Sequence, residues 1–456
     1  MFHTMGDLLE RMRQDWDARA KEDAKFYITC QRRNQDDAEF EAGAADVIPR
    51  LHRDYAYLPT VRPEELVFLE IGCGIGRLMR IVAKDCGLIH GVDISPEMVA
   101  AGRARLADLP QARFHVAHHN DLSGIAGDSV DWVYSHAVFQ HLPDREFVYR
   151  YLDDAWRVLK PGGIFTGHFN GAPALVDPID TWVGVWLREP DLLTRCSLQG
   201  WQVLASEGAD TQYMWLTMRK PLPEWFVLGS GDAPRVNLLA VERPNRGSPL
   251  IAGGPQGFAS LYLSGLPDHL SDLTALSVTV GEKLSPIRYI GPILPQQGRQ
   301  INVQIVEDTP TCWQPVVLRW QSHAISNVLE VQVQKREPRR ARLIAITDEE
   351  EIFSGNVIRC GVMQINLDGC QDIASLRTIV EGRPLISAEV YCVDPLAALF
   401  KANYRLPEDL RGEVAVHVEV DGERLPPCVI EITRSEHVGE GFSGLVEPGE
   451  AEDEGT

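Results

Sequence analysis

Apolar and polar residues follow two different periods along the chain, and the change falls near Met218. Over residues 5–53, apolar positions recur at helical spacing among many charges, which predicts two amphipathic helices lying against something larger. These positions are Leu8, Leu9, Met12 and Trp16, followed by Phe40, Val47, Ile48 and Leu51. From Leu66 to Phe169, short apolar runs alternate with helical patterns. Such alternation predicts βαβ units and therefore an α/β fold with a parallel sheet.

Beyond Met218 the helical period disappears. Proline and glycine are frequent over residues 220–255, which predicts a connecting segment. From residue 256 onward, short runs alternate apolar and polar residues, with turn residues between them. This pattern is typical of all-β sandwich domains.

The second half of the chain also repeats itself. The segment DLTALSVTVGEKL from Asp272 resembles DIASLRTIVEGRPL from Asp372, and LPQQGRQINVQIVED resembles LPEDLRGEVAVHVEVD. We therefore predict two tandem β-sandwich domains, over 256–345 and 356–435, similar in pattern to bacterial immunoglobulin-like domains. The tail over 436–456 carries seven acidic residues and neither Lys nor Arg, which predicts disorder.

Charge and cysteine usage narrow the function classes. The 456 residues hold 44 Lys and Arg against 65 Asp and Glu, a formal net charge of −21, which disfavours binding to nucleic acid or to an anionic membrane surface. No apolar run is long enough for a membrane span, and the charged N-terminus does not resemble a signal peptide. The nine cysteines never form a CxxC pair, which indicates reduced thiols without a metal site. We expect a cytoplasmic protein.

The sharpest motif is VFLEIGCGIGR over residues 67–77, a strand followed by three glycines and a helix. Glycines allow a tight turn and a close approach of backbone to a ligand. A dinucleotide fingerprint needs a glycine at position 77, where Arg77 stands, so a pyrophosphate ligand is disfavoured. Asp93, about 20 residues further on, can accept two hydrogen bonds from a diol. Two alternatives remain open: the glycines form only a tight turn, or Asp93 caps the helix that begins near Ser95.

These residues resemble a known family. The segments EIGCGIGR and HGVDIS resemble the first two motifs of class I S-adenosylmethionine-dependent methyltransferases, and residues 119–144 and VLKPGGIFTGHF resemble its later elements. The resemblance spans roughly residues 45–219. It implies a Rossmann-like methyltransferase domain over 54–219, behind an N-terminal helical cap over 1–53, with S-adenosyl-L-methionine as cofactor.

The resemblance also implies roles for single residues. The cofactor loop is expected at Gly72, Gly74 and Gly76, and Asp93 is expected to hold both ribose hydroxyls. Asn120, Asp121 and Leu122 are expected near the adenine, and Ser135 and His136 near the methyl group. The expected cofactor-binding set is completed by Glu70, Arg77 and Ile94.

Methyl transfer from a sulfonium is an in-line displacement that depends mainly on positioning. A base matters only when the acceptor must lose a proton, and His136, His141 and His168 are the candidates near the strand ends. For each of them a solvated or core histidine is the alternative. A tryptophan cluster, Trp182, Trp186 and Trp201, belongs either to the core or to the wall of an acceptor pocket roofed by the N-terminal helices.

Two functions remain open at this point. In the first, the protein methylates a small molecule or a carrier-borne metabolite, and the β-sandwiches bind the acceptor or a partner, or join copies of the chain. In the second, it is a non-catalytic scaffold that binds S-adenosylmethionine, and the β-sandwiches carry the function. In either case a chain ending near Met218 is expected to fold and to bind the cofactor, and residues 256–435 are expected to fold alone.

Overall fold

The computed structural model describes most of the chain, in two compact units. The described residues are 5–29, 33–45, 47–58, 62–118, 121–171, 184–226, 234–242, 250–252, 257–294, 298–334, 340–348, 355–385, 387, 389–394, 399–407 and 409–433. Those within Met1–Pro338 and Cys392–Ala397 form the first unit, and those within Arg339–Tyr391 and Ala398–Thr456 form the second. The acidic tail predicted to be disordered lies outside the described residues.

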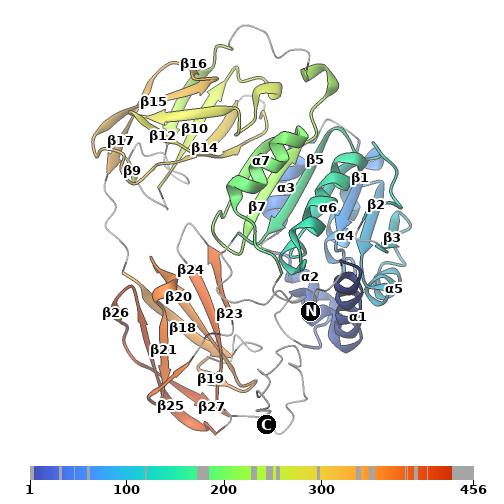
Figure 1. Ribbon diagram of the computed structural model, residues 1–456, viewed down its shortest axis with the longest axis vertical. Helices are drawn as coiled ribbons and strands as arrows, with labels where there is room; N and C mark the ends of the chain where they lie inside the picture. The colour runs from blue at the N-terminus through green and yellow to red at the C-terminus, as the bar shows by residue number, and fades with distance from the viewer. Residues whose placement is uncertain are drawn as a thin grey trace, which may run out of the picture. The chain divides into compact units, whose positions relative to one another are not determined.

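The predicted parallel sheet is confirmed (Figure 1). Its strand order is β3-β2-β1-β4-β5-β7-β6; the first five of these are parallel, and β7 runs antiparallel to both of its neighbours, β5 and β6. The bounds are β1 (Val67–Ile71), β2 (Leu88–Asp93), β3 (Ala112–Val116), β4 (Val130–Ser135), β5 (Leu159–Phe169), β6 (Gln202–Glu207) and β7 (Met214–Arg219). Because parallel strands share one carboxyl edge, the loops after β1, β2, β4 and β5 meet there.

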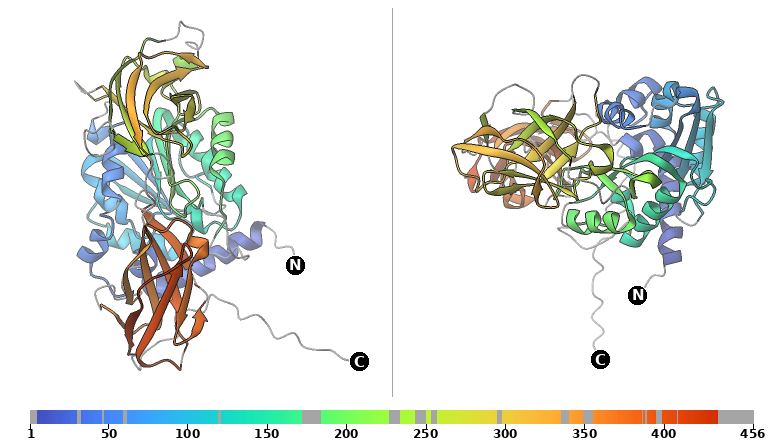
Figure 2. Two further views of the ribbon diagram at one scale, coloured as in Figure 1. Left: turned by 90° about the vertical axis from the view of Figure 1, so that its left-hand side faces the viewer. Right: turned by 90° about the horizontal axis from the view of Figure 1, so that it is seen from above.

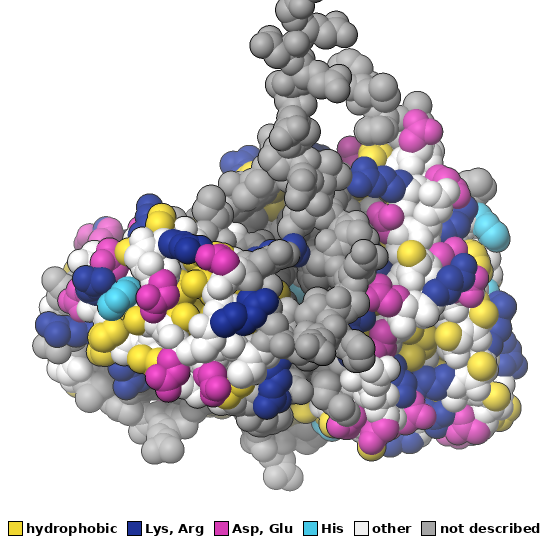
Figure 3. All heavy atoms as spheres, turned by 90° about the horizontal axis from the view of Figure 1, so that it is seen from below, with side chains coloured by type: hydrophobic (Ala, Val, Ile, Leu, Met, Phe, Trp, Pro, Cys, Tyr) yellow, Lys and Arg dark blue, Asp and Glu magenta, His cyan; other side chains and the backbone are white. Residues whose placement is uncertain are grey.

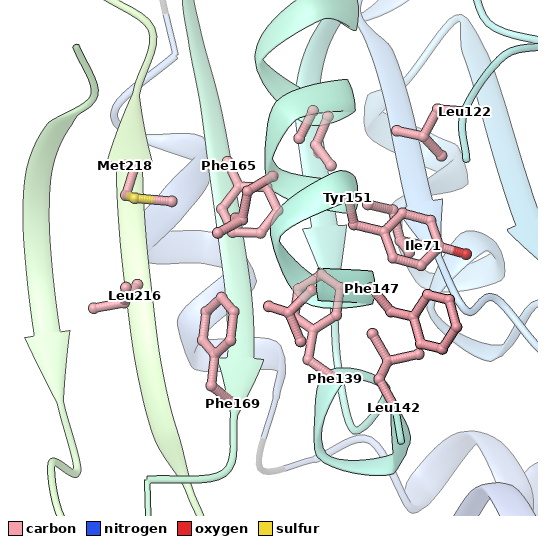
Figure 4. Close-up of a cluster of buried hydrophobic side chains, with 14 of the residues drawn as sticks. Ile71, Leu122, Phe139, Leu142, Phe147, Tyr151, Phe165, Phe169, Leu216 and Met218 are labelled. Atoms are coloured by element: carbon pink, nitrogen blue, oxygen red, sulfur yellow. The ribbon is translucent and has the colours of Figure 1, made fainter. Parts of the chain in front are cut away.

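Helices cover both faces of this sheet (Figure 1). Successive strand residues point to opposite faces, so Leu69 and Ile71 enter one core and Phe68 enters the other. On the first face, α6 (Arg145–Val158) packs with Phe139, Phe165 and Phe169 (Figure 4), and α7 (Glu189–Gln199) adds buried residues to the same core. On the second face lie α4 (Arg77–Val82) and α5 (Pro96–Arg105). Short 3-10 turns complete the connections: η1 (Pro63–Glu65), η2 (Ala83–Asp85), η3 (Phe139–His141) and η4 (Pro223–Phe226).

The N-terminal region forms three helices instead of the predicted two: α1 (Met5–Thr29), α2 (Asp37–Ala42) and α3 (Ile48–Tyr55). The expected second helix is broken because α2 ends at Gly43, and its apolar positions enter different cores, Phe40 in one and Leu51 in another. Within α1, Asp23 leaves helical geometry, with φ −163° and ψ 87°, and its carboxylate accepts the backbone N–H of Phe26 at 3.1 Å.

The sheet does not end at β6, although the predicted methyltransferase domain ends at residue 219. β13 (Ile287–Ile290) pairs antiparallel with it through Tyr289 and Ala205, and β14, β10 and β8 extend the sheet to 11 strands. The first β-repeat therefore shares a sheet with the α/β part. Its bounds are β8 (Asn237–Glu242), β9 (Leu250–Ala252), β10 (Phe258–Ser264), η5 (Asp268–Leu270), β11 (Leu276–Val280), β12 (Lys283–Ser285), β14 (Arg299–Gln304), β15 (Trp313–Trp320), β16 (His323–Ala324) and β17 (Leu329–Gln334).

The prediction of a plain connecting segment over 220–255 is wrong in part, because β8 and β9 fall within it. β8 pairs with β10, and β9 pairs with β17 in the second sheet of this repeat, whose order is β12-β11-β15-β17-β9. Proline and glycine marked the turns around these strands but not the strands themselves. One hydrophobic cluster takes residues from both sheets of the repeat.

The second unit repeats this pairing, with sheets β18-β20-β24-β23 and β19-β27-β25-β21-β22 around one cluster (Figure 2). The strands of these two sheets are β18 (Arg342–Asp348), β19 (Val357–Ile358), β20 (Val362–Asp368), β21 (Arg377–Val380), β22 (Arg383–Leu385), β23 (Glu389–Asp394), β24 (Leu399–Arg405), β25 (Gly412–Val420), β26 (Glu423–Arg424) and β27 (Cys428–Ile432), with η6 (Ile373–Ser375). The predicted end of the first repeat at residue 345 was too late, because β18 pairs with β20.

None of the helices in the described ranges is both long and apolar enough to cross a membrane. On the face seen in Figure 3, the described Lys and Arg side chains are interspersed with Asp and Glu.

Candidate functional site

The glycine loop after β1 adopts a backbone that favours glycine. Gly72, Gly74 and Gly76 have φ of +69°, +49° and +80°, in the left-handed region. A Cβ on Gly72 would lie 2.1 Å from a methyl group of Val138, and one on Gly74 would lie 2.7 Å from the end of Ile28 in α1. Backbone geometry therefore favours glycine at all three positions, and Val138 packs closely over Gly72. Both interpretations of the glycines from the sequence, a tight turn and a ligand loop, fit these positions.

Asp93, at the end of β2, is bonded to that loop. Its Oδ2 accepts the backbone N–H of Gly74 at 2.9 Å, and its Oδ1 accepts the N–H of Ser95 at 2.9 Å. Burial raises the pKa of Asp93 to about 6, although the amides of Ser95, Gly74 and Ile94 oppose this shift. Ser95 itself caps α5, because its hydroxyl accepts the N–H of Met98 at 3.0 Å. Ser95, and not Asp93, therefore supplies the side-chain cap of α5, while backbone amides of the loop and of the residues after β2 hold the Asp93 carboxylate.

Two charged residues flank the loop. Glu70, at the end of β1, is buried, and burial raises its pKa to about 8, with Arg77 and the amide of Met79 opposing the shift. Arg77 is also buried, and its Nη1 donates to the carbonyl of Gly43 at 2.8 Å, which ties α4 to the end of α2. The described contacts therefore give Arg77 a structural role.

The expected adenine segment is described only in part. Asn120 lies outside the described residues. The carboxylate of Asp121 accepts the hydroxyl of Ser123 at 3.0 Å in a local turn. Leu122 is buried, and its N–H donates to Asp154 of α6 at 2.9 Å. This bond fixes the middle of the loop between β3 and β4.

At the end of β4 the structure distinguishes Ser135 from His136. Ser135 is fully buried, and its hydroxyl donates to the carbonyl of Ile71 at 3.1 Å, so it joins β4 to β1. His136 is half-buried, and its ring lies nearly parallel to that of Trp215, with centroids 5.5 Å apart. Burial, followed by neighbouring positive groups, lowers the pKa of His136 well below its usual value. His136 is therefore neutral near pH 7.

His168, on β5, has both ring nitrogens in use. Its Nδ1 accepts the N–H of Ala137 at 3.2 Å, and its Nε2 lies 3.0 Å from the carbonyl of Gln212, to which it donates. The ring stacks on Trp215 and is fully buried, and burial lowers the pKa of His168 to about 3. No nitrogen is left for a substrate proton, so we assign His168 to packing.

The remaining candidates meet other partners. His141 lies against α1, with its ring 5.4 Å from that of Trp16 in an edge contact. Trp201 is buried and contacts Trp156 edge-on at 4.9 Å, so it belongs to the core. Trp186 is half-buried, and Trp182 lies outside the described residues.

Sequence reasoning missed a polar cluster between α3, β6 and β7. Arg53 donates to Glu207 at 2.9 Å, and Arg50 donates to the same carboxylate. Although burial alone would raise it, these two arginines hold the pKa of Glu207 at about 2. Arg50 also lies 4.4 Å above the ring of Trp215. The spacing of Arg50 and Arg53 on one helix face was the available signal.

The N-terminal helix α1 contacts residues at the carboxyl edge of the parallel sheet. The carboxylate of Asp17 accepts the hydroxyl of Ser95 and, at 3.2 Å, the N–H of Glu97. Arg13 donates to the carbonyl of His118 at 3.0 Å. Helix α1 thus contacts the residues that follow β2 and β3.

Comparison with known proteins finds a methyltransferase domain in this part of the chain. A family model described as a methyltransferase domain matches residues 69–166. The chain is 33% identical over 119 residues to phosphoethanolamine N-methyltransferase 2 of Caenorhabditis elegans, covering 25% of this chain and 26% of that protein. It is 38% identical over 127 residues to 2-methyl-6-phytyl-1,4-hydroquinone methyltransferase of Synechocystis, covering 27% of this chain and 38% of that protein. The chain therefore spans well under half the length of these curated relatives.

Among solved structures, phosphoethanolamine N-methyltransferase 1 of Haemonchus contortus, in complex with phosphoethanolamine and S-adenosylhomocysteine, is 17% identical, with a TM-score of 0.37. The match covers 50% of this chain and 51% of that chain. Together, the family match and the curated relatives identify residues 69–166 as a class I S-adenosylmethionine-dependent methyltransferase domain.

Proposed function

We propose that this protein transfers a methyl group from S-adenosylmethionine to a small-molecule or carrier-borne acceptor. The observation that carries the proposal is the pairing of the glycine loop with Asp93 inside a methyltransferase domain. The pairing places a carboxylate that can accept hydrogen bonds from a diol beside a loop whose three glycines have positive φ.

The cofactor, when bound, supplies an electrophilic methyl group on a sulfonium. Asp93 would hold the ribose hydroxyls, while Gly74, bonded to Asp93, keeps the loop in register with that carboxylate. Glu70 and Ile94 flank this pair on β1 and after β2. The protein therefore contributes mainly orientation, which is what an in-line displacement requires.

For the acceptor side we propose His136. Among the described residues no hydrogen bond engages its ring, in contrast to His168, and its neutral form can accept a proton from a hydroxyl acceptor. An amine acceptor that is already neutral needs no base. The names of the relatives cover both chemistries: N-methylation of phosphoethanolamine, and O-methylation by the ubiquinone biosynthesis O-methyltransferase of Xanthomonas oryzae.

The proposed roles of the β-repeats are acceptor binding or contact between copies of the chain, and their immunoglobulin-like identity remains part of this proposal. The seven cysteines whose side chains are described are free thiols, which supports a reducing, cytoplasmic compartment.

The experiment is a transfer assay with the full chain and methyl-tritiated S-adenosylmethionine. Phosphoethanolamine, a methylated hydroquinone and a catechol serve as acceptors. We expect label in one acceptor class, and its loss in Asp93→Ala. The matched control is Asp409→Ala, an exposed carboxylate of the second unit, which should transfer at the wild-type rate. Tight binding of S-adenosylmethionine without transfer to any acceptor would favour the non-catalytic scaffold.

A further inference from the structure

The first β-repeat reaches the acceptor side of the methyltransferase domain through one strand. On β13, the ring of Tyr289 lies 5.2 Å below the guanidinium of Arg53 in α3. The next residue, Ile290, accepts the hydroxyl of Tyr57 at 2.7 Å in a buried hydrogen bond. The repeat is thus packed against α3 and the residues that follow it.

Arg53 is held on several sides. Its Nη1 donates to both carboxylate oxygens of Glu207, at 3.1 and 2.9 Å, and its Nη2 donates to Asp54 at 3.2 Å and to the hydroxyl of Thr217 at 3.3 Å. Asp54 is fully buried, and burial raises its pKa. A planar guanidinium held by two carboxylates and an aromatic face has little freedom to move.

From Glu207 the contacts lead to the candidate base. Glu207 also accepts Arg50, and Arg50 lies 4.4 Å above the ring of Trp215. Trp215 stacks on His136 with an interplanar angle of 14°. A continuous chain of contacts therefore joins Tyr289 in the first β-repeat to His136 at the end of β4.

We infer that Arg53 is a positioning residue through which Tyr289 of the first β-repeat fixes the Trp215–His136 wall of the acceptor site. The inference rests on the proposed function, because it assigns that wall to the acceptor. The first repeat is then a working part of the methyltransferase unit. If loss of the Tyr289 ring loosens Arg53, Glu207 no longer fixes Arg50, and Trp215 loses the cation that packs on its ring.

The test compares two neighbouring residues of β13. Tyr289→Leu removes the ring under Arg53, and Tyr289→Phe keeps it. The matched control is Arg288→Gln, because Arg288 also joins β13 to the methyltransferase domain, by an ion pair with Glu189 at 2.7 Å, but does not touch Arg53. Glu207→Gln breaks the same chain of contacts at β6. An effect shared by Glu207→Gln and Tyr289→Leu therefore cannot come from a folding defect confined to β13.

The first readout is the His136 ring signal in NMR spectra of histidine-labelled protein saturated with S-adenosylhomocysteine, assigned by its loss in His136→Gln. We expect this signal to move in Tyr289→Leu and Glu207→Gln, because the ring current of Trp215 shifts, and to stay in Tyr289→Phe and Arg288→Gln. The second readout is methyl transfer to the acceptor found in the transfer assay. In Tyr289→Leu and Glu207→Gln, kcat should fall about tenfold, and KM should stay within about threefold of the wild-type value.

Equal shifts of the His136 signal in Arg288→Gln and Tyr289→Leu would overturn the inference, since simple tethering would then explain both. An unmoved signal in Tyr289→Leu and Glu207→Gln would overturn it as well. Absence of methyl transfer by the wild type would instead contradict the proposed function, while the NMR comparison would still decide whether Tyr289 positions the wall.

Discussion

Asp93 accepts the backbone N–H of Gly74 at 2.9 Å, so the residue proposed to hold the ribose also fixes the glycine loop. Loop and carboxylate therefore form one unit, although 19 residues separate them in the chain. A substitution at Asp93 is therefore expected to weaken cofactor binding in two ways: it removes the acceptor of the ribose hydroxyls, and it releases the glycine loop.

The pKa of Asp93, which burial raises to about 6, predicts pH-dependent cofactor binding. The ionised carboxylate accepts hydrogen bonds from a diol, and protonation removes part of this capacity. Affinity for S-adenosylhomocysteine should therefore be highest above pH 6 and fall about tenfold between pH 7.5 and 5. Calorimetric titrations at several pH values measure it. Asp93→Asn should bind weakly with a flat profile, and a flat profile in the wild type would contradict the assignment.

Glu70 predicts a pH effect on stability. Its pKa is about 8 in the folded chain against an ordinary glutamate value of 4.5, so between these values the folded state binds more protons than the unfolded state. This contribution to stability is complete below pH 4.5 and is lost as pH rises toward 8. Glu70→Gln removes the penalty, and its free energy of unfolding should gain on the wild type by up to about 1.4 kcal/mol per pH unit in this window.

Denaturant unfolding at pH 5 and pH 8 measures this difference. An equal gap between Glu70→Gln and wild type at both pH values would show that Glu70 does not titrate in the window.

His136 and His168 should respond differently to substitution. His168→Gln removes a ring with two backbone hydrogen bonds, so it should cost about 1–3 kcal/mol of stability while the remaining activity keeps its pH profile. His136→Gln should keep the stability and lower kcat by about 100-fold on a hydroxyl acceptor. Thermal melts and pH–rate profiles separate the two, and a changed pH profile in His168→Gln would reverse the assignment.

The shared sheet alters the expected behaviour of truncated chains. A chain ending at Met218 lacks β13, which leaves Ala205 on an open edge and deprives Tyr57 of its buried acceptor. It should melt at least about 5 °C below a chain ending at Pro338. Residues 340–433, with their own core, should fold alone as β structure. Circular dichroism tests both expectations. Equal melting temperatures for the chains ending at Met218 and at Pro338 would show that β13 does not stabilise the α/β part.

The sequence predicted the parallel sheet well, because period and glycine spacing are local signals. It could not predict that β13 joins β6, since Tyr289 and Ala205 lie far apart in the chain and a single pair forms the bridge. Nor could it separate His136 from His168, because the difference depends on where the folded chain places the amide of Ala137. Side-chain contacts across elements carry no periodic signal.

The internal repeat shows the same limit. Similar segments predicted two β units, and strand pairing repeats in both. The boundary at residue 345 was misplaced because β8 and β18, the first strand of each repeat, lie outside the segments that match in sequence. Pairing with β10 and β20 defines these strands, and pairing is a property of the fold.

The most direct test of the account is a calorimetric titration of the full chain with S-adenosylmethionine at pH 7.5, wild type beside Asp93→Ala. Two charge-assisted hydrogen bonds to the ribose are each worth about 1.5–3 kcal/mol, so affinity in the variant should fall at least about tenfold while the protein remains folded. Binding of the cofactor by Asp93→Ala at wild-type affinity, or no binding by the wild type, would contradict the central claim.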